Sequence, residues 1–297
     1  MIMETVPLTL HRDPPQSLSV VREPSEWQSH HESAQAVIQH AMDHLPVLKR
    51  ALVVGVGTGR DLPINITGFE QIYLHDSERA NIRAVRNLLT SWGGRGVLND
   101  VLGGMTGISY QLRDYLAAIH EQLTPAALAS DLRSLIETPR RVKLLTQYPA
   151  NLTVSSMVIP RVLDEPLLQF RSQLETKLGK EKFGELAETF DRMIGELKTQ
   201  LFFEYLLMLS RQTDPLDGVM ALNVPMSVRE NGITRPVLPA GADRYLGILS
   251  ARSRKILAGE TDFEWTWNYD PLQQYRVKGY ILKADQIGEE DRRLLSQ

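Results

Sequence analysis

The spacing of apolar side chains predicts short buried strands that alternate with amphipathic helices. The segment from near Ser25 to Pro46 has apolar positions at helical spacing, and a short β-branched run, Ala51–Val54, follows it. A second short run, Gln71–Leu74, precedes a helical pattern over Glu78–Leu89. Because strands that alternate with helices usually pair in parallel, this order predicts an α/β sheet.

The second half of the chain predicts further strands, a long helical stretch and a hairpin. Leu152–Val158 and Val219–Val224 are predicted strands, and Glu165–Arg211 has helical spacing. Phe263–Asn268 and Gln274–Lys283 alternate apolar and polar residues on either side of a turn. This pattern predicts an antiparallel hairpin at the edge of the sheet.

The third strand of the sheet has two candidates. A glycine-rich stretch follows the second predicted helix, and helical patterns then cover Tyr110–Gln122 and Pro125–Glu137. The strand is either Val97–Val101, before these helices, or Val142–Thr146, after them. We favour the second candidate, which makes residues 92–141 a helical insertion.

Composition narrows the class of protein. The chain has 297 residues, of which 42% are hydrophobic and 23% charged, as in ordinary globular proteins. Its net charge of -3 provides no global basic field for nucleic acid, and the lack of cysteine excludes disulfides and thiolate chemistry. No secretory signal begins the sequence, and the most apolar segment, Leu201–Leu209, is too short to span a membrane. We therefore expect a cytoplasmic protein without a membrane segment.

The segment Ala51–Leu62, with the sequence ALVVGVGTGRDL, carries the strongest chemical signal. Glycines at alternate positions after a buried strand let the backbone turn sharply and approach a ligand closely. A dinucleotide-binding loop has the spacing G-x-G-x-x-G, and here Arg60 or Leu62 stands where its third glycine belongs. The G-x-G-x-G spacing therefore argues against a nicotinamide cofactor.

This loop resembles the first motif of class I S-adenosylmethionine-dependent methyltransferases, and the resemblance covers roughly Leu48 to Lys283. It implies an α/β, Rossmann-like and mostly parallel sheet with helices on both faces, closed by the C-terminal antiparallel hairpin. It also implies a division into an N-terminal arm and helix over residues 1–45 and a methyltransferase-like domain over residues 46–297.

The resemblance implies a site for S-adenosylmethionine at the carboxyl ends of the strands. In that family an acid at the place of Asp76 binds the ribose hydroxyls, although this residue could instead cap the helix that follows. Family members also carry an acid two positions before the first glycine, which orients the methionine amine. Val53 stands there in this chain, so the amine contact is unassigned. The implied cofactor residues are Gly55, Val56, Gly57, Thr58, Gly59, Asp76, Ser77, Ser155 and Ser156.

Histidines and tryptophans offer weaker signals. His75 beside the predicted ribose acid is favoured as a structural residue over a catalytic base. His40 and His44 have chelating i, i+4 spacing, and histidines also stand at positions 30 and 31, but no metal-binding motif accompanies them, so no metal site is predicted. Trp265 and Trp267 share one face of a predicted strand, where packing is favoured over stacking on an acceptor.

The leading functional hypothesis is methyl transfer from S-adenosylmethionine to a small-molecule or peptide acceptor. A non-catalytic methyltransferase-like binding module is the first alternative, and a nicotinamide-dependent oxidoreductase is the second. Nucleic acid is not the expected partner. The apolar face of residues 174–197 could either cover the active site or form a homodimer contact, and the sequence leaves both alternatives open.

Overall fold

Apolar runs pair into an eight-stranded sheet in the part of the chain that the structure describes. The order is β3-β2-β1-β4-β5-β8-β7, and β6 pairs with β5 off this path. The first five strands in this order are parallel, while β8, β7 and β6 run antiparallel to their neighbours. The strands are β1 (Arg50–Val54), β2 (Gln71–Asp76), β3 (Val97–Val101), β4 (Leu152–Ser156), β5 (Val219–Glu230), β6 (Ile233–Pro236), β7 (Asp262–Asn268) and β8 (Gln273–Lys283).

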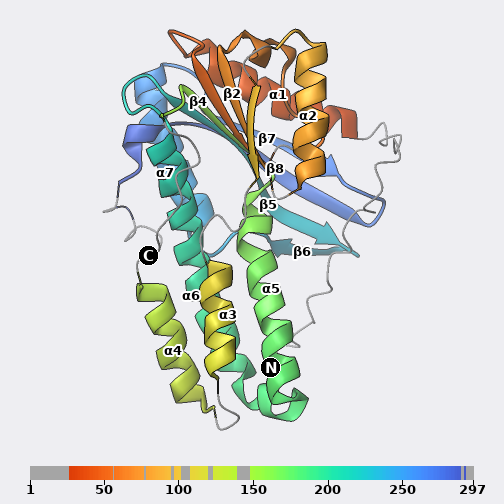
Figure 1. Cartoon of the computed structure of the whole chain (residues 1–297), viewed down its shortest axis with the longest axis vertical. Helices are drawn as coiled ribbons and strands as arrows, with labels where there is room; N and C mark the ends of the chain where they lie inside the picture. Colours follow the sequence, from red (N-terminus) through yellow and green to blue (C-terminus); the bar gives the residue numbers. More distant parts are fainter. Residues whose placement is uncertain are drawn as a thin grey trace.

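Helices cover both faces of this sheet (Figure 1). The structure is a computed structural model. It describes residues 27–55, 57–76, 78–94, 97–101, 108–119, 123–138, 148–288 and 291. The helices are α1 (Gln28–Asp43), α2 (Arg79–Ser91), α3 (Ile108–Ala118), α4 (Pro125–Glu137), α5 (Ile159–Leu178), α6 (Lys180–Gln212) and α7 (Ala242–Leu257), with short 3-10 turns at Ile64–Gly68 and Ala284–Gln286.

The alternation of side chains along β1 separates two layers of core. Leu52 and Val54 belong to a cluster that includes residues of α5, α6 and α7. Ala51 and Val53 point the opposite way, into a cluster with residues of α1 and α2. Because a parallel strand is buried on both faces, every one of these positions is apolar. The predicted α/β, Rossmann-like sheet with helices on both faces is confirmed.

The preference for Val142–Thr146 as the third strand is wrong. Val97–Val101 forms β3, which pairs in parallel with β2 from Ile72 opposite Val97 to Asp76 opposite Val101. Strands that follow one another through a single helix usually lie side by side, and α2 provides that crossover. Asn99 and Asp100 in the middle of this strand weaken its pattern, because both residue types are uncommon in strands. Residues 142–146 lie outside the described part of the chain.

The stretch 92–141 is therefore only partly a helical insertion, since it contributes β3 before the helices α3 and α4. Thr124 caps α4 as its sequence indicates, and its side chain accepts a hydrogen bond from the Ala127 backbone N–H at 3.2 Å. The predicted helix over Glu165–Arg211 is two helices, α5 and α6. Gly179 separates them with a φ of +80°, a conformation that glycine adopts without strain.

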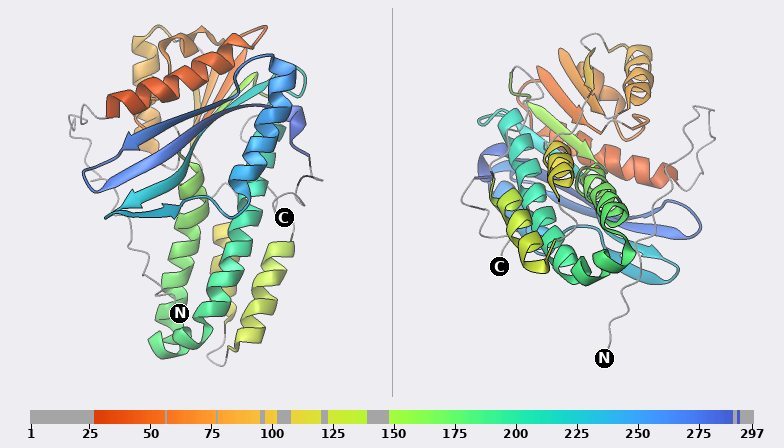
Figure 2. Two further views of the ribbon diagram at one scale, coloured as in Figure 1. Left: turned by 180° about the vertical axis from the view of Figure 1, so that it is seen from behind. Right: turned by 60° about the horizontal axis from the view of Figure 1, so that its bottom comes forward.

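The helices α3 to α6 form a bundle that extends away from the sheet, as Figures 1 and 2 show. α6 packs against α4 and α5, and α3 packs against α5. The apolar face of residues 174–197 is used inside this bundle, where Leu174, Leu186 and Leu197 are fully buried. This face therefore gives no support to either a lid or a homodimer contact. No helix in the described ranges is long and apolar enough to cross a membrane.

The C-terminal hairpin forms as predicted, with β7 at the edge and β8 between β7 and β5. α1 packs on β7. Trp265 and Trp267 both contact His30 of α1: the Trp265 indole N–H donates to His30, and the Trp267 ring stacks on it at a centroid distance of 4.2 Å. Both tryptophans therefore pack between the hairpin and the first helix.

Candidate cofactor site at the carboxyl ends of the strands

The loop after β1 has the sharp turns that its glycines predict. Gly55, Gly57 and Gly59 have φ values of +71°, +47° and +79°, a region that residues with a side chain rarely adopt. The Gly55 N–H donates to the backbone carbonyl of His75 at 2.8 Å, which joins the start of the loop to the end of β2. Thr58 lies in the described part of the loop, whereas Val56 lies outside the described residues.

The three glycines have different surroundings. A Cβ at Gly55 would lie 1.6 Å from the Val158 side chain, and one at Gly59 would lie 2.8 Å from the Val85 side chain. These two positions therefore need glycine for packing as well as for backbone conformation. Among the described residues, a Cβ at Gly57 would meet no atom within 4 Å beyond its two chain neighbours. The loop thus packs against the protein at both ends and borders open space at its centre.

Asp76, the predicted ribose acid, holds this loop from the end of β2. Its Oδ2 accepts a hydrogen bond from the Gly57 backbone N–H at 3.1 Å. Its Oδ1 accepts from the Glu78 backbone N–H at 2.8 Å and from the Asn81 side chain at 3.2 Å, so the same carboxylate also supports the start of α2. A carboxylate offers about four acceptor positions, and three are used here. Ser77, which follows Asp76, lies outside the described residues.

The two serines at the end of β4 have different roles. Ser155 lies opposite Val54 in the parallel register, so the end of β4 is at the same edge of the sheet as the glycine loop. The Ser155 hydroxyl is buried and lies 2.7 Å from the hydroxyl of Tyr205 in α6. The Ser156 hydroxyl donates instead to Asp61 Oδ2 at 2.6 Å. Only Ser156 is connected to the segment after the glycine loop.

Asp61, which the motif comparison did not single out, is the centre of this hydrogen-bond network. His31 Nδ1 lies 2.7 Å from its Oδ1, and Ser156 occupies its other oxygen. Burial alone would raise the pKa of Asp61, but the hydrogen bonds from His31 and Ser156 and the nearby His30 hold the pKa below its usual value. Asp61 is therefore ionised at neutral pH, and its side chain is 21% exposed.

The sequence contained one signal for this network, because Asp61 comes two residues after Gly59, the last glycine of the motif. Its partners could not be recognised from spacing. His31 comes from α1, thirty positions earlier, and Ser156 comes from β4, ninety-five positions later. Asn223 of β5 lies opposite Ser156 and donates to its hydroxyl at 3.3 Å. The network thus joins α1, the glycine loop and two neighbouring strands.

His30, His31 and Asp61 are close enough to suggest a metal site, but their hydrogen bonds oppose it. The Trp265 indole N–H can only donate, and it donates to His30 Nδ1 at 3.0 Å. A neutral His30 then carries its proton on Nε2, the nitrogen that lies 3.7 Å from Asp61. That nitrogen has no lone pair for a metal. Burial, the largest effect, lowers the pKa of His30 to about 4, so the neutral form is the one present.

The other candidate histidines also occupy packed positions. His40 and His44 pack edge to face with ring centroids 5.1 Å apart. His75 is buried in β2, with a side-chain exposure of 1%.

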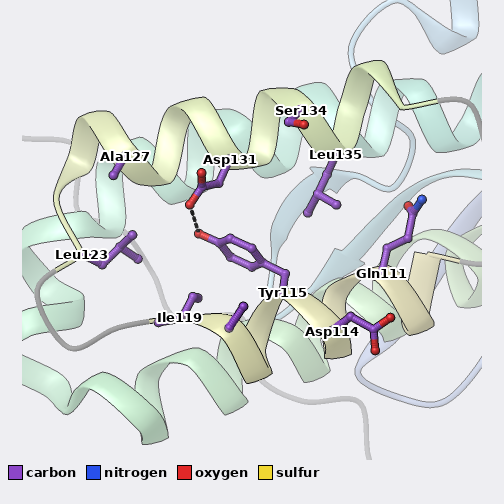
Figure 3. A pocket seen from close by; sticks show the side chains of 10 residues that line it. Gln111, Asp114, Tyr115, Ile119, Leu123, Ala127, Asp131, Ser134 and Leu135 are labelled. Carbon is purple, nitrogen blue, oxygen red and sulfur yellow. Dashed lines mark hydrogen bonds between the residues drawn. The ribbon is translucent and has the colours of Figure 1, made fainter.

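A separate pocket of about 800 Å³ lies between α3 and α4 (Figure 3). Its lining is mainly apolar and includes Ile119, Leu123 and Leu135. Tyr115 projects across it from α3 and donates a hydrogen bond to Asp131 of α4 at 3.1 Å, which the dashed line in Figure 3 marks. This pocket contains none of the residues predicted to bind a cofactor.

The strand order, the glycine loop after β1 and the closing antiparallel hairpin are those of the class I methyltransferase fold that the resemblance implied. No protein-family model matches the chain, and no curated protein matches it.

Solved structures that resemble the chain include several methyltransferases. A S-adenosylmethionine-dependent methyltransferase from Leishmania major is 13% identical, with a TM-score of 0.41, and the match covers 86% of this chain and 73% of that one. A S-adenosylmethionine-dependent methyltransferase from Clostridium acetobutylicum is 9% identical, with a TM-score of 0.36, and covers 94% and 82%. An N-methyltransferase from Bradyrhizobium japonicum is 9% identical, with a TM-score of 0.36, and covers 88% and 98%. Likenesses this low say nothing of the reaction.

Proposed function

We propose that the chain binds S-adenosylmethionine at the Gly55–Gly59 loop and transfers its methyl group to a small-molecule or peptide acceptor. The observation that supports this most directly is the open space at Gly57, next to the carboxylate of Asp76. In an open α/β sheet, ligands bind outside the carboxyl ends of the strands, and both residues lie at that edge.

The residues at this edge fit the chemistry of the cofactor. Gly57 lets a ligand approach the backbone closely, and Asp76 places an acceptor where a ribose hydroxyl could donate. Asp61 provides a second, ionised carboxylate from the other side of the loop. The bound cofactor would supply the reactive methyl group on its sulfonium. The protein would hold the acceptor in line with that group and exclude water.

Calorimetric titration of the full chain tests the binding part of this proposal. We expect S-adenosylmethionine and its demethylated product, S-adenosylhomocysteine, to bind, and NAD not to bind. Binding of NAD alone would favour the oxidoreductase alternative. Binding of none of the three would contradict the proposed cofactor site.

A second candidate function is binding without transfer. Val53 favours it, because this residue replaces an acid of the family and is buried with 1% exposure in the core beneath the loop. Incubation with S-adenosylmethionine labelled on its methyl group, together with the small-molecule and peptide fractions of a cell extract, separates the two functions. Transfer predicts labelled product with the parent chain and none with a Gly57→Val variant. Cofactor binding without any labelled product would favour the silent module.

A further inference from the structure

The acidic position that the family uses for the cofactor amine is missing here, and a different acid lies at the same edge of the sheet. Val53 points into the core between the sheet and the helices α1 and α2, and its apolar side chain cannot bind the amine. Asp61, two residues after Gly59, reaches the end of β4 through its hydrogen bond to Ser156. Because β1 and β4 are neighbours, this carboxylate lies between the ends of two adjacent strands.

Asp61 has capacity left for a cationic ligand. A carboxylate can accept about four hydrogen bonds, and the hydrogen bonds of Asp61 with other described residues use one position on each oxygen, from His31 and Ser156. The side chain is 21% exposed, so a ligand can reach it. Its pKa is below the usual value, because the hydrogen bonds outweigh the effect of burial, and the group therefore keeps its charge at neutral pH.

A second polar side chain, Asn223, is joined to this carboxylate through Ser156. Since Asp61 is ionised, the Ser156 hydroxyl must donate to it and can only accept from Asn223. This fixes the Asn223 amide with its NH₂ group toward Ser156. The opposite atom, Asn223 Oδ1, is buried and has no hydrogen-bond partner among the described residues. Because this atom has essentially no accessible surface, a ligand cannot contact it, and Asp61 is the accessible acceptor of this network.

From this arrangement we infer that Asp61 holds the ammonium group of the amino-acid part of S-adenosylmethionine, in place of the acid that Val53 has replaced. The inference rests on the proposed function. An ammonium group has three donors and no acceptor, so it suits the acceptor positions that remain on an ionised carboxylate. Asp76, on the β2 side of the loop, would remain the partner of the ribose. The two acids then recognise opposite ends of one ligand.

The test compares two ligands that differ only in the ammonium group. S-adenosylhomocysteine and its desamino analogue are titrated calorimetrically into the parent chain and into Asp61→Asn. We expect the parent to prefer S-adenosylhomocysteine by roughly tenfold to a hundredfold, the range for one hydrogen-bonded charged pair. Asp61→Asn should abolish most of this preference by weakening S-adenosylhomocysteine, while the affinity for the desamino analogue changes by less than about threefold.

Two control variants exclude indirect effects. Asp43→Asn makes the same change of charge at the exposed end of α1 and should leave the preference intact. Ser156→Ala removes a partner of Asp61 but keeps its charge, so the preference should persist even if both affinities fall. Urea unfolding of each variant establishes that it is folded.

The outcomes separate the inference from the proposed function. If the parent binds neither ligand, the proposed function fails and the inference fails with it. If the parent binds both equally, or if Asp61→Asn weakens both by the same factor, the cofactor site stands and the ammonium role of Asp61 is wrong. A preference lost in Asp61→Asn and kept in both controls supports the inference.

Discussion

The Asp76 carboxylate accepts a hydrogen bond from the Gly57 backbone N–H at 3.1 Å, which ties the end of β2 to the centre of the glycine loop. Of the three glycines in the loop, Gly57 is the one at which an added Cβ would meet no atom of the described residues within 4 Å. We therefore expect a substitution at Gly57 to impair ligand binding more than it impairs folding.

Gly57→Ala should abolish or strongly weaken binding of S-adenosylhomocysteine while the chain stays folded. The added methyl group enters the space that a ligand would use, and the positive φ costs about 1–2 kcal/mol. Gly93→Ala is the matched control, because Gly93 also has a positive φ, +89°, and a Cβ there would meet no atom of the described residues within 4 Å. Calorimetry and urea unfolding of both variants provide the measurement. Equal binding by the two variants would refute the loop assignment.

Asp76→Asn should weaken S-adenosylhomocysteine and its desamino analogue by the same factor, because the ribose is common to both. A loss of about 1.5–3 kcal/mol is expected for a charged acceptor, or roughly tenfold or more in Kd. This pattern is the opposite of that expected for Asp61→Asn, which distinguishes the ligands. Unchanged Kd values, together with a less stable protein, would show that Asp76 does not bind the ribose. Its role would then be structural, through its contacts with Gly57, Glu78 and Asn81.

Tyr205→Phe should destabilise the protein by about 1–3 kcal/mol without changing cofactor affinity. It leaves the buried Ser155 hydroxyl without its partner, 50 positions away in the chain. The double variant Ser155→Ala/Tyr205→Phe removes both polar groups and should recover much of the loss. Urea unfolding measures the stabilities. A Ser155→Ala variant of normal stability that fails to bind S-adenosylhomocysteine would return Ser155 to the cofactor site.

His30 should make stability fall as the pH falls from about 6.5 toward 4. Burial lowers its pKa in the folded state from 6.5 to about 4, so the unfolded chain binds a proton more readily than the folded chain. The contribution of neutral His30 is therefore fully present above pH 6.5 and lost below it. The loss between pH 7.5 and pH 5 should be about 2 kcal/mol.

The measurement is urea unfolding of the parent and of His30→Gln at both pH values. Glutamine keeps an acceptor for the Trp265 indole but does not titrate. The variant should therefore show a smaller fall in stability between the two pH values. Equal falls in the parent and the variant would mean that His30 does not control this part of the pH dependence.

Local sequence by itself determined much of the architecture. Four apolar runs became β1, β2, β4 and the first half of β5, because buried parallel strands require apolar side chains on both faces. The alternation that begins at Phe263 specified the hairpin, and Thr124 specified the start of α4 through its own hydroxyl. The glycine loop was likewise predictable, since three positive φ values exclude most other residues.

The tertiary structure decided which residues meet at the end of the strands. Alternation along β4 places Ser155 and Ser156 on opposite faces, but only packing determines that one meets Tyr205 and the other Asp61. The Trp265 contact with His30 joins residues 235 positions apart, and it sets the tautomer that opposes metal binding. Neither relationship leaves a periodic trace in the sequence, because each depends on which surfaces of separate elements are brought together. The third strand also depended on tertiary structure. Val97–Val101 pairs with the edge of β2 that β1 leaves free, and its own apolar pattern did not predict this.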